Sequence, residues 1–303
     1  MPRLEIADPR PTTAWLAESA RWGQPWRDPD GNPSAYTFRH AGECWIEVPG
    51  CARFRFGNGN TVFAFPERDA GVAAVRDVYL RNVLPVALQV LGIEVLHASA
   101  VHFPGGVVVF CAESEAGKST IAYGLSRRGY PIWGDDAVAF DGARSRPRAI
   151  ALPFEVRLRP AAAALFGLTP AQNGEGTFRN RSIDQARSSG EVTGLNPDPG
   201  LRTPITHARV AAVCVLDRRN HAVSGQPVQI ARLTPTRAFT ALLPHAYCFS
   251  LQDSEHKRRM LRQYLDLTAR VAVFDVRLRT GLDNLTAILD EIVELVAGLT
   301  CPA

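Results

Sequence analysis

The chain has 303 residues, which is long enough to bury the core of one large domain or of a domain with a small extra module. Hydrophobic residues make up 46% and charged residues 21%, and 34 basic residues against 30 acidic ones give a net charge of +4, too balanced to indicate a nucleic-acid partner. No apolar run is long enough to span a membrane and no basic-then-apolar leader is present, so we expect a cytoplasmic protein without a membrane partner.

The first 70 residues predict a small β-rich module with a mobile start. Residues 1–34 are rich in Pro, Arg and Trp and show little periodicity, apart from a short helix expected at 12–21. From 36 to 65, apolar and polar residues alternate between Gly and Asn-Gly turn signals, which predicts three or four antiparallel strands. We expect one face of this sheet to be packed with aromatic rings, those of Phe54, Phe56, Phe63 and Phe65.

Residues 71–91 carry apolar side chains at steps of 3 and 4, which predicts a helix that Pro85 should kink. The chain then enters an apolar strand at 95–101, which contains His97. The following Phe-Pro-Gly-Gly at 103–106 predicts the turn of a hairpin into the next strand. A single strand His is commonly a core or edge residue, so His97 alone is weak evidence for a catalytic site.

The stretch 107–128 contains the most informative motif. Residues 107–111 form a short β-branched run that predicts a buried strand, and 120–128 carry a helical pattern that ends at Gly129. Between them the chain fits the phosphate-loop pattern with Ala in the first Gly position, through Ala112, Glu113, Ser114, Glu115, Ala116, Gly117, Lys118 and Ser119, followed by Thr120. In such a loop backbone N–H groups face a polyphosphate, Lys118 reaches its outer phosphates and Ser119 is placed to bind Mg²⁺. The alternative is a chance Gly-Lys-Ser in this position.

Two adjacent acids follow in a second strand-like run at 130–140. Asp135 and Asp136 interrupt its apolar residues, and carboxylates in a buried strand are costly unless a cation lies beside them. A metal-bound nucleotide would supply that cation. The alternative is a Gly-Asp-Asp surface turn, although strand character resumes at Ala137.

The rest of the chain predicts alternating strands and helices. We expect a strand at 152–160 with Arg157 and Arg159 on one side, where they either hold a phosphate or acidic peptide or form a solvated face. A long loop at 169–203 separates it from later elements, which are strands at 210–216, 228–233 and 271–278 and helices from 234, at 254–270 and at 285–296. The six Cys show no metal-binding spacing and are expected to be reduced thiols.

The order of His97, a strand, AESEAGKST, a short helix and GDDAV is similar to the catalytic core of the HPr kinase/phosphorylase superfamily, whose nucleotide site is related to that of phosphoenolpyruvate carboxykinase. Residues 152–168, 204–219 and 232–247 also resemble HPr-kinase-like proteins of peptide-modification clusters, in particular the lasso-peptide kinases, which phosphorylate a C-terminal Ser of a precursor peptide. The resemblance covers roughly 70–300. It implies an α/β fold, with a mixed-sheet kinase core of the phosphate-loop type at 71–303 after the small antiparallel module.

The resemblance also implies a set of residue roles. Lys118 and Ser119 would hold phosphate and Mg²⁺, and His97 would lie beside the transferred phosphoryl group of ATP. Asp136 would act as the general base while Asp135 supports the metal, a division less firmly implied than the pair itself. In this superfamily a segment of the long loop covers the acceptor. The resemblance therefore implies that two arginines of this loop, Arg179 and Arg181, contact phosphate or the acceptor.

Three positions depart from the family pattern. HPr kinases have Gly where this chain has Ala112 and Glu115, and an acid where it has Thr120. Glu115 is the least compatible, because a carboxylate inside a phosphate-binding loop repels the ligand unless it points outward or supports the metal. No segment matches the one that supports phosphorolysis in the bifunctional family, so we expect kinase activity without the reverse reaction.

The sequence therefore predicts an ATP- and Mg²⁺-dependent kinase whose acceptor is a Ser or Thr hydroxyl. The resemblance favours the C-terminal Ser of a lasso precursor peptide, with an HPr-like carrier protein as the alternative. A non-catalytic nucleotide-binding regulatory module, a degenerate pseudoenzyme and a small-molecule kinase also stay open. No repeat or tail indicates an oligomer, although proteins of this superfamily often assemble, so a homo-oligomer stays open.

Overall fold

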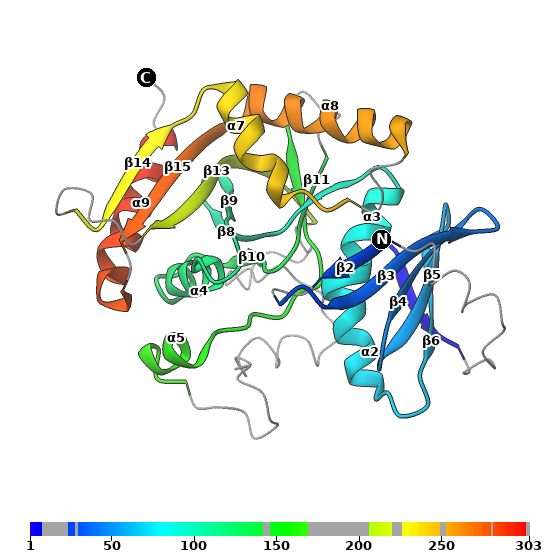
Figure 1. Cartoon of the computed structure of the whole chain (residues 1–303). Helices are drawn as coiled ribbons and strands as arrows, with labels where there is room; N and C mark the ends of the chain where they lie inside the picture. Colours follow the sequence, from blue (N-terminus) through cyan, green and yellow to red (C-terminus); the bar gives the residue numbers. More distant parts are fainter. Residues whose placement is uncertain are drawn as a thin grey trace. The chain divides into compact units, whose positions relative to one another are not determined.

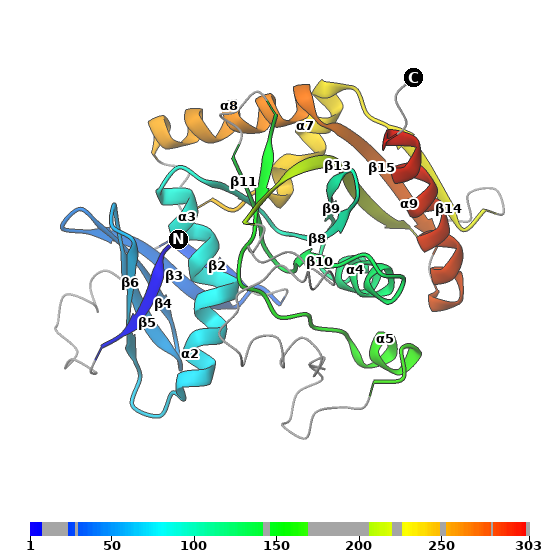
Figure 2. The same ribbon diagram turned by 180° about the vertical axis from the view of Figure 1, so that it is seen from behind.

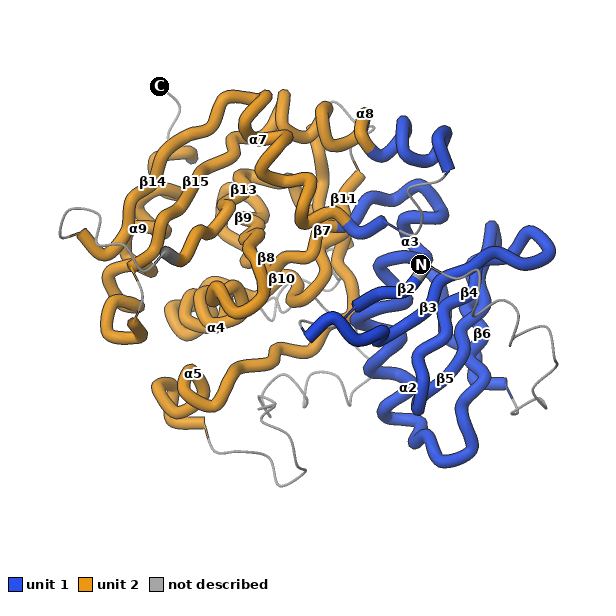
Figure 3. Tube along the Cα trace, viewed as in Figure 1, with its two compact units in different colours: residues 1–95, 247–260 blue, residues 96–246, 261–303 orange. Residues whose placement is uncertain are grey.

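A computed structural model describes residues 1–7, 24–27, 30–141, 146–168, 206–219, 226–248, 253–279 and 281–300 (Figure 1). It divides into two compact units, shown in Figure 3: unit 1 comprises 1–95 and 247–260, and unit 2 comprises 96–246 and 261–303. The boundary expected at residue 70 stays a prediction. The helix expected at 12–21 and the loop with Arg179 and Arg181 lie outside the described residues.

Unit 1 contains a six-stranded sheet in the order β1-β6-β5-β4-β3-β2. Its strands are β1 (Arg3–Ile6), β2 (Gln24–Arg27), β3 (Pro33–His40), β4 (Glu43–Val48), β5 (Ala52–Phe56) and β6 (Thr61–Pro66). The predicted antiparallel strands of residues 36–65 are confirmed as β3 to β6. β1 adds to β6 in parallel.

The prediction that four Phe side chains share one face of this sheet is wrong. Phe54 of β5 lies opposite Ala64 of β6, and Arg55 lies opposite Phe63. Because neighbouring strand residues point to opposite faces, Phe54 and Phe56 line the buried face, whereas Phe63 and Phe65 share the other face with Arg55. The Arg55 guanidinium lies 4.7 Å from the centroid of the Phe63 ring.

The predicted helix with a distortion near Pro85 is present as three segments: α2 (Val72–Val78), a π-helical segment η1 (Tyr79–Val83) and α3 (Leu84–Val90). Pro85 has no N–H to donate to the carbonyl of Arg81, four residues earlier, and its ring would clash there. The π-helical segment directly before Pro85 widens the helix, and the Tyr247 hydroxyl donates to the Arg81 carbonyl at 3.4 Å. The lost helical hydrogen bond is thus replaced from another segment of unit 1.

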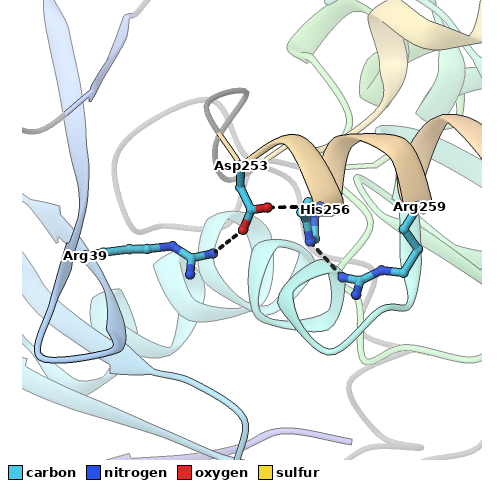
Figure 4. Close-up of polar contacts among 4 residues, drawn as sticks. All are labelled: Arg39, Asp253, His256 and Arg259. Carbon is cyan, nitrogen blue, oxygen red and sulfur yellow. Dashed lines mark hydrogen bonds and ion pairs between the residues drawn. The ribbon is translucent and has the colours of Figure 1, made fainter.

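The predicted helix at 254–270 is confirmed as α8 (Ser254–Arg270). Figure 4 shows the polar contacts at its start. Asp253 accepts a hydrogen bond from the His256 N–H at 3.0 Å, which caps the helix and lowers the pKa of Asp253. Arg39 lies 3.3 Å from the same carboxylate, and Arg259 donates to the His256 ring at 2.7 Å (Figure 4).

Unit 2 is built on a larger, mixed sheet. Its strands are β8 (Ala98–Phe103), β9 (Gly106–Cys111), β10 (Ile132–Gly134), β11 (Val138–Asp141), β12 (Arg148–Ile150), β13 (His207–Arg219), β14 (Val228–Arg232) and β15 (Ala272–Arg279), and the short β7 (Glu94–Leu96) lies where the chain passes between units. The predicted hairpin is confirmed as β8 and β9, with Phe103 opposite Gly106. β9, β13 and β15 run parallel to one another. Mixed α/β architecture is therefore confirmed, as is the presence of parallel and antiparallel strands in one sheet.

Helices cover both faces of this sheet. α4 (Lys118–Arg127) and α9 (Leu285–Thr300) share a hydrophobic core with alternate residues of β9, β13 and β15. A Cβ at Gly124 of α4 would lie 2.7 Å from a methyl of Leu289, so the two helices approach too closely for a larger residue. α7 (Pro235–Leu242) lies on the other face: it is in front of β13 and β15 in Figure 1, whereas α9 is in front in Figure 2.

The predicted strand at 152–160 is wrong. This segment pairs only through an isolated bridge at Leu158, and α5 (Pro160–Leu165) begins directly after it. Val156 and Leu158 instead pack into a second hydrophobic cluster with Tyr123 of α4 and Ile132 of β10. The alternating pattern thus reflects packing against a helix rather than pairing with a neighbouring strand.

None of the helices that the structure describes combines the length and apolar character needed to cross a membrane. The cysteines at 44, 51, 111, 214 and 248 are free thiols, as expected, and Cys301 lies outside the described residues.

Candidate active site

The predicted order of strand, loop and helix is present: β9 ends at Cys111, and α4 begins at Lys118. Gly117 at the N-cap has φ 101°, a left-handed conformation that a side chain would strain, and space for a Cβ is open, so backbone freedom explains the Gly here. The N–H groups of the first turn of α4 have no acceptor within the helix and point out of its N-terminal end. Such a helix start favours an anionic ligand.

Lys118 is buried at the start of α4, with 7% of its surface exposed. Its ammonium donates hydrogen bonds to the carbonyls of Ala112 at 3.0 Å and Glu113 at 3.1 Å. Burial lowers the pKa of Lys118, while the nearby carboxylates of Asp136 and Asp135 oppose that effect. The ammonium therefore donates to the loop while it is close enough to both acids to interact with them electrostatically.

Glu115 does not enter the loop interior. Glu115 has φ 70°, and its exposed carboxylate pairs with the exposed guanidinium of Arg159. Arg218 of β13 donates to the Glu115 carbonyl at 3.3 Å. The repulsion expected from this departure is thus reduced by the outward direction of the side chain and by the two arginines, Arg159 and Arg218.

Asp135 and Asp136 lie in a turn between β10 and β11, not inside one strand as predicted. The two strands pair with different neighbours, β10 with β8 and β11 with β12, so the chain must change direction at the acids. The alternative of a surface turn also fails for Asp135, which is 4% exposed.

The Asp135 carboxylate is held by two serines. Its Oδ1 accepts hydrogen bonds from Ser119 at 3.0 Å and from Ser99 of β8. Burial raises the pKa of Asp135, as does the neighbouring Asp136, whereas hydrogen bonds from both serines and from the Arg157 main-chain N–H lower it. Its Oδ2 is buried and has no hydrogen-bond partner among the described residues. One carboxylate oxygen is therefore fixed and the other is available to a cation.

His97 lies between β7 and β8 rather than within a strand. Its Nδ1 is 3.0 Å from the carbonyl oxygen of Asp136, to which only a protonated nitrogen can donate. This contact therefore requires a proton on Nδ1. Asp136 has φ 63°, uncommon for a residue with a side chain, so the His97 contact helps to hold a strained turn.

Sequence reasoning missed His245, in the short helical turn η2 (Leu243–His245). The His245 carbonyl accepts a hydrogen bond from the His97 N–H at 2.7 Å. Burial lowers the pKa of His245 to about 4, and the charges of Lys118 and His97 act in the same direction. No local sequence pattern indicates that His245 belongs to the site. It is brought there by its contact with His97, which is far away in the sequence. Ser99, by contrast, is a polar residue in an otherwise apolar strand, a signal that the sequence does contain.

These residues fit an Mg²⁺ site of the kind that phosphate ligands complete. Ser119 and Asp135 are hydrogen-bonded to each other, and Asp135 Oδ2 lacks a partner in the described part of the chain. No group of three or more His, Cys, Asp or Glu side chains in the described ranges is arranged to hold a metal alone. Mg²⁺ needs no such group, since it is commonly bound by one or two protein oxygens together with phosphates and water.

Comparisons with known proteins add little to this geometry. No family model matches the chain, and no curated protein matches it. Among solved structures, the HPr(Ser) kinase/phosphatase from Coxiella burnetii superposes with a TM-score of 0.35 and 10% identity, over 68% of this chain and 92% of that one. A superposition this loose establishes neither a shared fold nor a shared activity.

Proposed function

We propose that this chain is an ATP-dependent kinase that transfers a phosphoryl group to a Ser or Thr hydroxyl of a peptide or protein. The observation that carries the proposal is the link between Ser119 and Asp135, at the start of a helix that also carries the buried Lys118. A loop serine joined to an acid on a neighbouring strand end is the arrangement by which phosphate-loop enzymes hold Mg²⁺ on a nucleoside triphosphate. Bound there, Mg²⁺ would neutralise charge on the phosphates of ATP.

In the proposed reaction the acceptor oxygen forms a bond to Pγ of ATP, and the bond from Pγ to the β–γ bridging oxygen breaks. ADP leaves with that electron pair, and the Asp136 carboxylate takes the proton of the hydroxyl. Lys118 would stabilise charge on the transferred group and on ADP. His97, whose Nδ1 is engaged with the Asp136 carbonyl, would keep the turn that carries the base in position.

The resemblance of the motifs to lasso-peptide kinases favours a precursor peptide as acceptor, specifically its C-terminal Ser. An HPr-like carrier protein is the alternative acceptor. The transfer assay therefore includes a C-terminal-Ser peptide, a carrier protein and free serine, each with radiolabelled ATP. Transfer to free serine alone would indicate a small-molecule kinase instead.

An unusual feature of the composition makes nucleotide binding simple to test. Lys118 and Lys257 are the two lysines of a chain that is otherwise rich in arginine. An acyl-phosphate derivative of ATP transfers its acyl group to a lysine amine close to the bound phosphates, and mass spectrometry of peptides shows which lysine reacted. We expect Lys118 to be labelled, Lys257 to remain unlabelled, and excess ATP with Mg²⁺ to prevent the labelling.

Two variants complete this test. Lys257→Ala should preserve labelling and transfer, whereas Lys118→Ala should abolish both. Asp136→Asn should keep the ATP-protected labelling of Lys118 and lose transfer by about 100-fold or more, as expected for a general base. Labelling without transfer to any acceptor would favour the nucleotide-binding regulatory module, and labelling that ATP does not prevent would overturn the proposed function.

A further inference from the structure

Glu94 is a buried carboxyl group of unit 1 that the fold leaves without hydrogen-bond donors. It begins β7 and is 0% exposed, and neither of its oxygens has a hydrogen-bond partner among the described residues. Buried polar atoms in folded proteins are nearly always hydrogen-bonded, because an unpaired one loses its water without a replacement. The groups around Glu94 should therefore explain why it is tolerated.

Arg259 of α8 is the cation that acts on this carboxyl. Its charge opposes the effect of burial on the pKa of Glu94. Its Cζ and Nε lie 3.7 Å from the position that a Cβ on Gly92 would take, so the guanidinium covers the turn two residues before Glu94. Next to Arg259, the sulfur of Met260 accepts a hydrogen bond from Gln89 of α3 at 3.7 Å. The first turns of α8 thus pack on the segment that joins α3 to β7.

The guanidinium nevertheless donates to a different acceptor. Its Nη2 lies 2.7 Å from Nδ1 of His256, one turn earlier in α8 (Figure 4). Because a guanidinium only donates, Nδ1 accepts, and a neutral His256 ring then carries its proton on Nε2. That Nε2 is buried and also lacks a hydrogen-bond partner in the described part of the chain. Arg259 therefore serves an imidazole while a buried carboxyl beside it has no donor.

The two acceptors take up protons in different pH ranges. Burial lowers the pKa of His256, and the charge of Arg259 acts in the same direction. Arg39 also lowers it, whereas Asp253 opposes these effects. Burial raises the pKa of Glu94 to about 7, so this carboxyl becomes an anion only as the pH rises through that value. A carboxylate is a stronger acceptor than a neutral imidazole, so the balance between the acceptors changes there.

We propose that Arg259 is the moving part of a pH-sensitive switch, which donates to His256 while Glu94 is protonated and to Glu94 once that proton is lost. A guanidinium has five N–H donors on a long side chain, so rotation of the side chain exchanges the acceptors. The arrangement in Figure 4 is the protonated form. Protonation of His256 at lower pH also ends the contact, because Nδ1 then has no lone pair to accept with.

The switch is tested in the full chain with ¹⁵N-labelled histidine, because the resonance of Nδ1 depends on whether that nitrogen accepts a hydrogen bond. The His256 signal is identified by its absence in His256→Gln. In wild type it should show a step with a midpoint near pH 7, separate from the protonation of the ring itself. Glu94→Gln has no proton to lose and should reduce the step at least about fivefold. Glu5→Gln, at an exposed carboxyl of the same unit, should retain it.

Arg259→Ala separates movement of the guanidinium from a direct effect of the Glu94 charge on the His256 ring. The titration of this variant extends to about pH 9.5, because loss of the cation raises the pKa of Glu94 further. The step should be absent, and Arg258→Ala, at the neighbouring exposed arginine, should keep it. A step in Arg259→Ala as large as in wild type, or no step in wild type, would overturn the switch.

Urea unfolding gives a second measurement that does not depend on the histidine signals. In a double-mutant cycle of Glu94→Gln with Arg259→Ala, the coupling between the two changes should alter the unfolding constant about tenfold or more at pH 8.5. At pH 6, where Glu94 is protonated, it should alter the constant less than about twofold. The cycle with Arg258→Ala should show no coupling at either pH. Equal coupling of Glu94 and Arg259 at the two pH values would contradict the proposed exchange.

Discussion

Two carboxyl groups of this protein are buried to a similar degree and yet have different surroundings. Asp135 in unit 2 is 4% exposed and accepts hydrogen bonds from Ser99 and Ser119, with Lys118 close enough to interact. Glu94 in unit 1 is 0% exposed, and neither of its oxygens has a hydrogen-bond partner in the described part of the chain. Burial raises the pKa of both groups to about 7, and it is opposed at Asp135 by hydrogen bonds from the two serines and at Glu94 by Arg259 alone.

The two carboxyl groups therefore differ in the hydrogen-bond donors around them rather than in the pKa. Donors directed at Oδ1 of Asp135 stabilise its ionised form and leave Oδ2 for a cation. Glu94 has no comparable donors, so Arg259 alone offsets its burial. Burial alone therefore does not identify a functional acid, and the number of donors around it does.

The largest expected effect is on Asp135. Asp135→Asn keeps the size of the side chain and removes the negative charge, so the proposed transfer should fall about 1,000-fold or more. Glu94→Gln is the same chemical change at the other buried carboxyl, and it should alter kcat less than about threefold. Steady-state transfer from radiolabelled ATP measures both, and equal losses in the two variants would show that the distinction drawn from the donors has no functional meaning.

The next effect is the pH dependence of stability at Glu94. Its folded pKa of about 7 lies above the ordinary value of 4.5, so the folded state binds the proton more tightly. The stabilisation is complete below about pH 4.5 and is lost as the pH rises through about 7, with a total of about 3 kcal/mol. Glu94→Gln should therefore stabilise the protein more at pH 8 than at pH 5, measured by urea unfolding. Glu5→Gln, at an exposed carboxyl of the same unit, should show no such pH-dependent gain.

Local patterns were sufficient for the parts of the site that are contiguous in sequence. The β-branched run before Ala112, the loop with Lys118, and the helix after it each follow from neighbours within a few residues, because hydrogen bonds of strands and helices impose short periods. The acids were also recognised from their neighbours. Their turn was not, since only the different pairing of β10 and β11 requires the chain to bend there.

Local patterns did not predict the contacts between segments that are distant in sequence. Ser99 and Asp135 are 36 positions apart, and their hydrogen bond depends on the pairing of β10 with β8. His245 reaches His97 through a carbonyl in a later turn, and the extended segment at 152–158 packs on α4 although its alternation is that of a strand. Each of these depends on which surfaces meet, and a single sequence does not specify that locally.

Ser99 tests whether the donors around Asp135 matter. Ser99→Ala removes one hydrogen bond from Oδ1 and leaves Ser119 in place, so a cation should be held less well. We expect the Mg²⁺ concentration for half-maximal transfer to rise about tenfold, with a smaller change in kcat at saturating Mg²⁺. Ser126→Ala, which removes a hydroxyl that donates to the Tyr123 carbonyl in α4, is the matched serine control. An unchanged Mg²⁺ requirement would mean that Ser99 supports the fold alone.

The smallest effect is expected at Glu115, an acid that the loop motif places in the phosphate-binding region and the structure directs outward. Its side chain is 61% exposed and pairs with Arg159 at the surface, where an ion pair contributes only about 0–1 kcal/mol. Glu115→Gln should therefore change the KM for ATP less than about twofold at 0.15 M salt, because the carboxylate is screened from the ligand. If the side chain instead turned into the loop, removing its charge would relieve repulsion and lower the KM about tenfold. Exposed Glu115, buried Glu94 without donors and hydrogen-bonded Asp135 would then no longer form a series in which donors and burial together determine function.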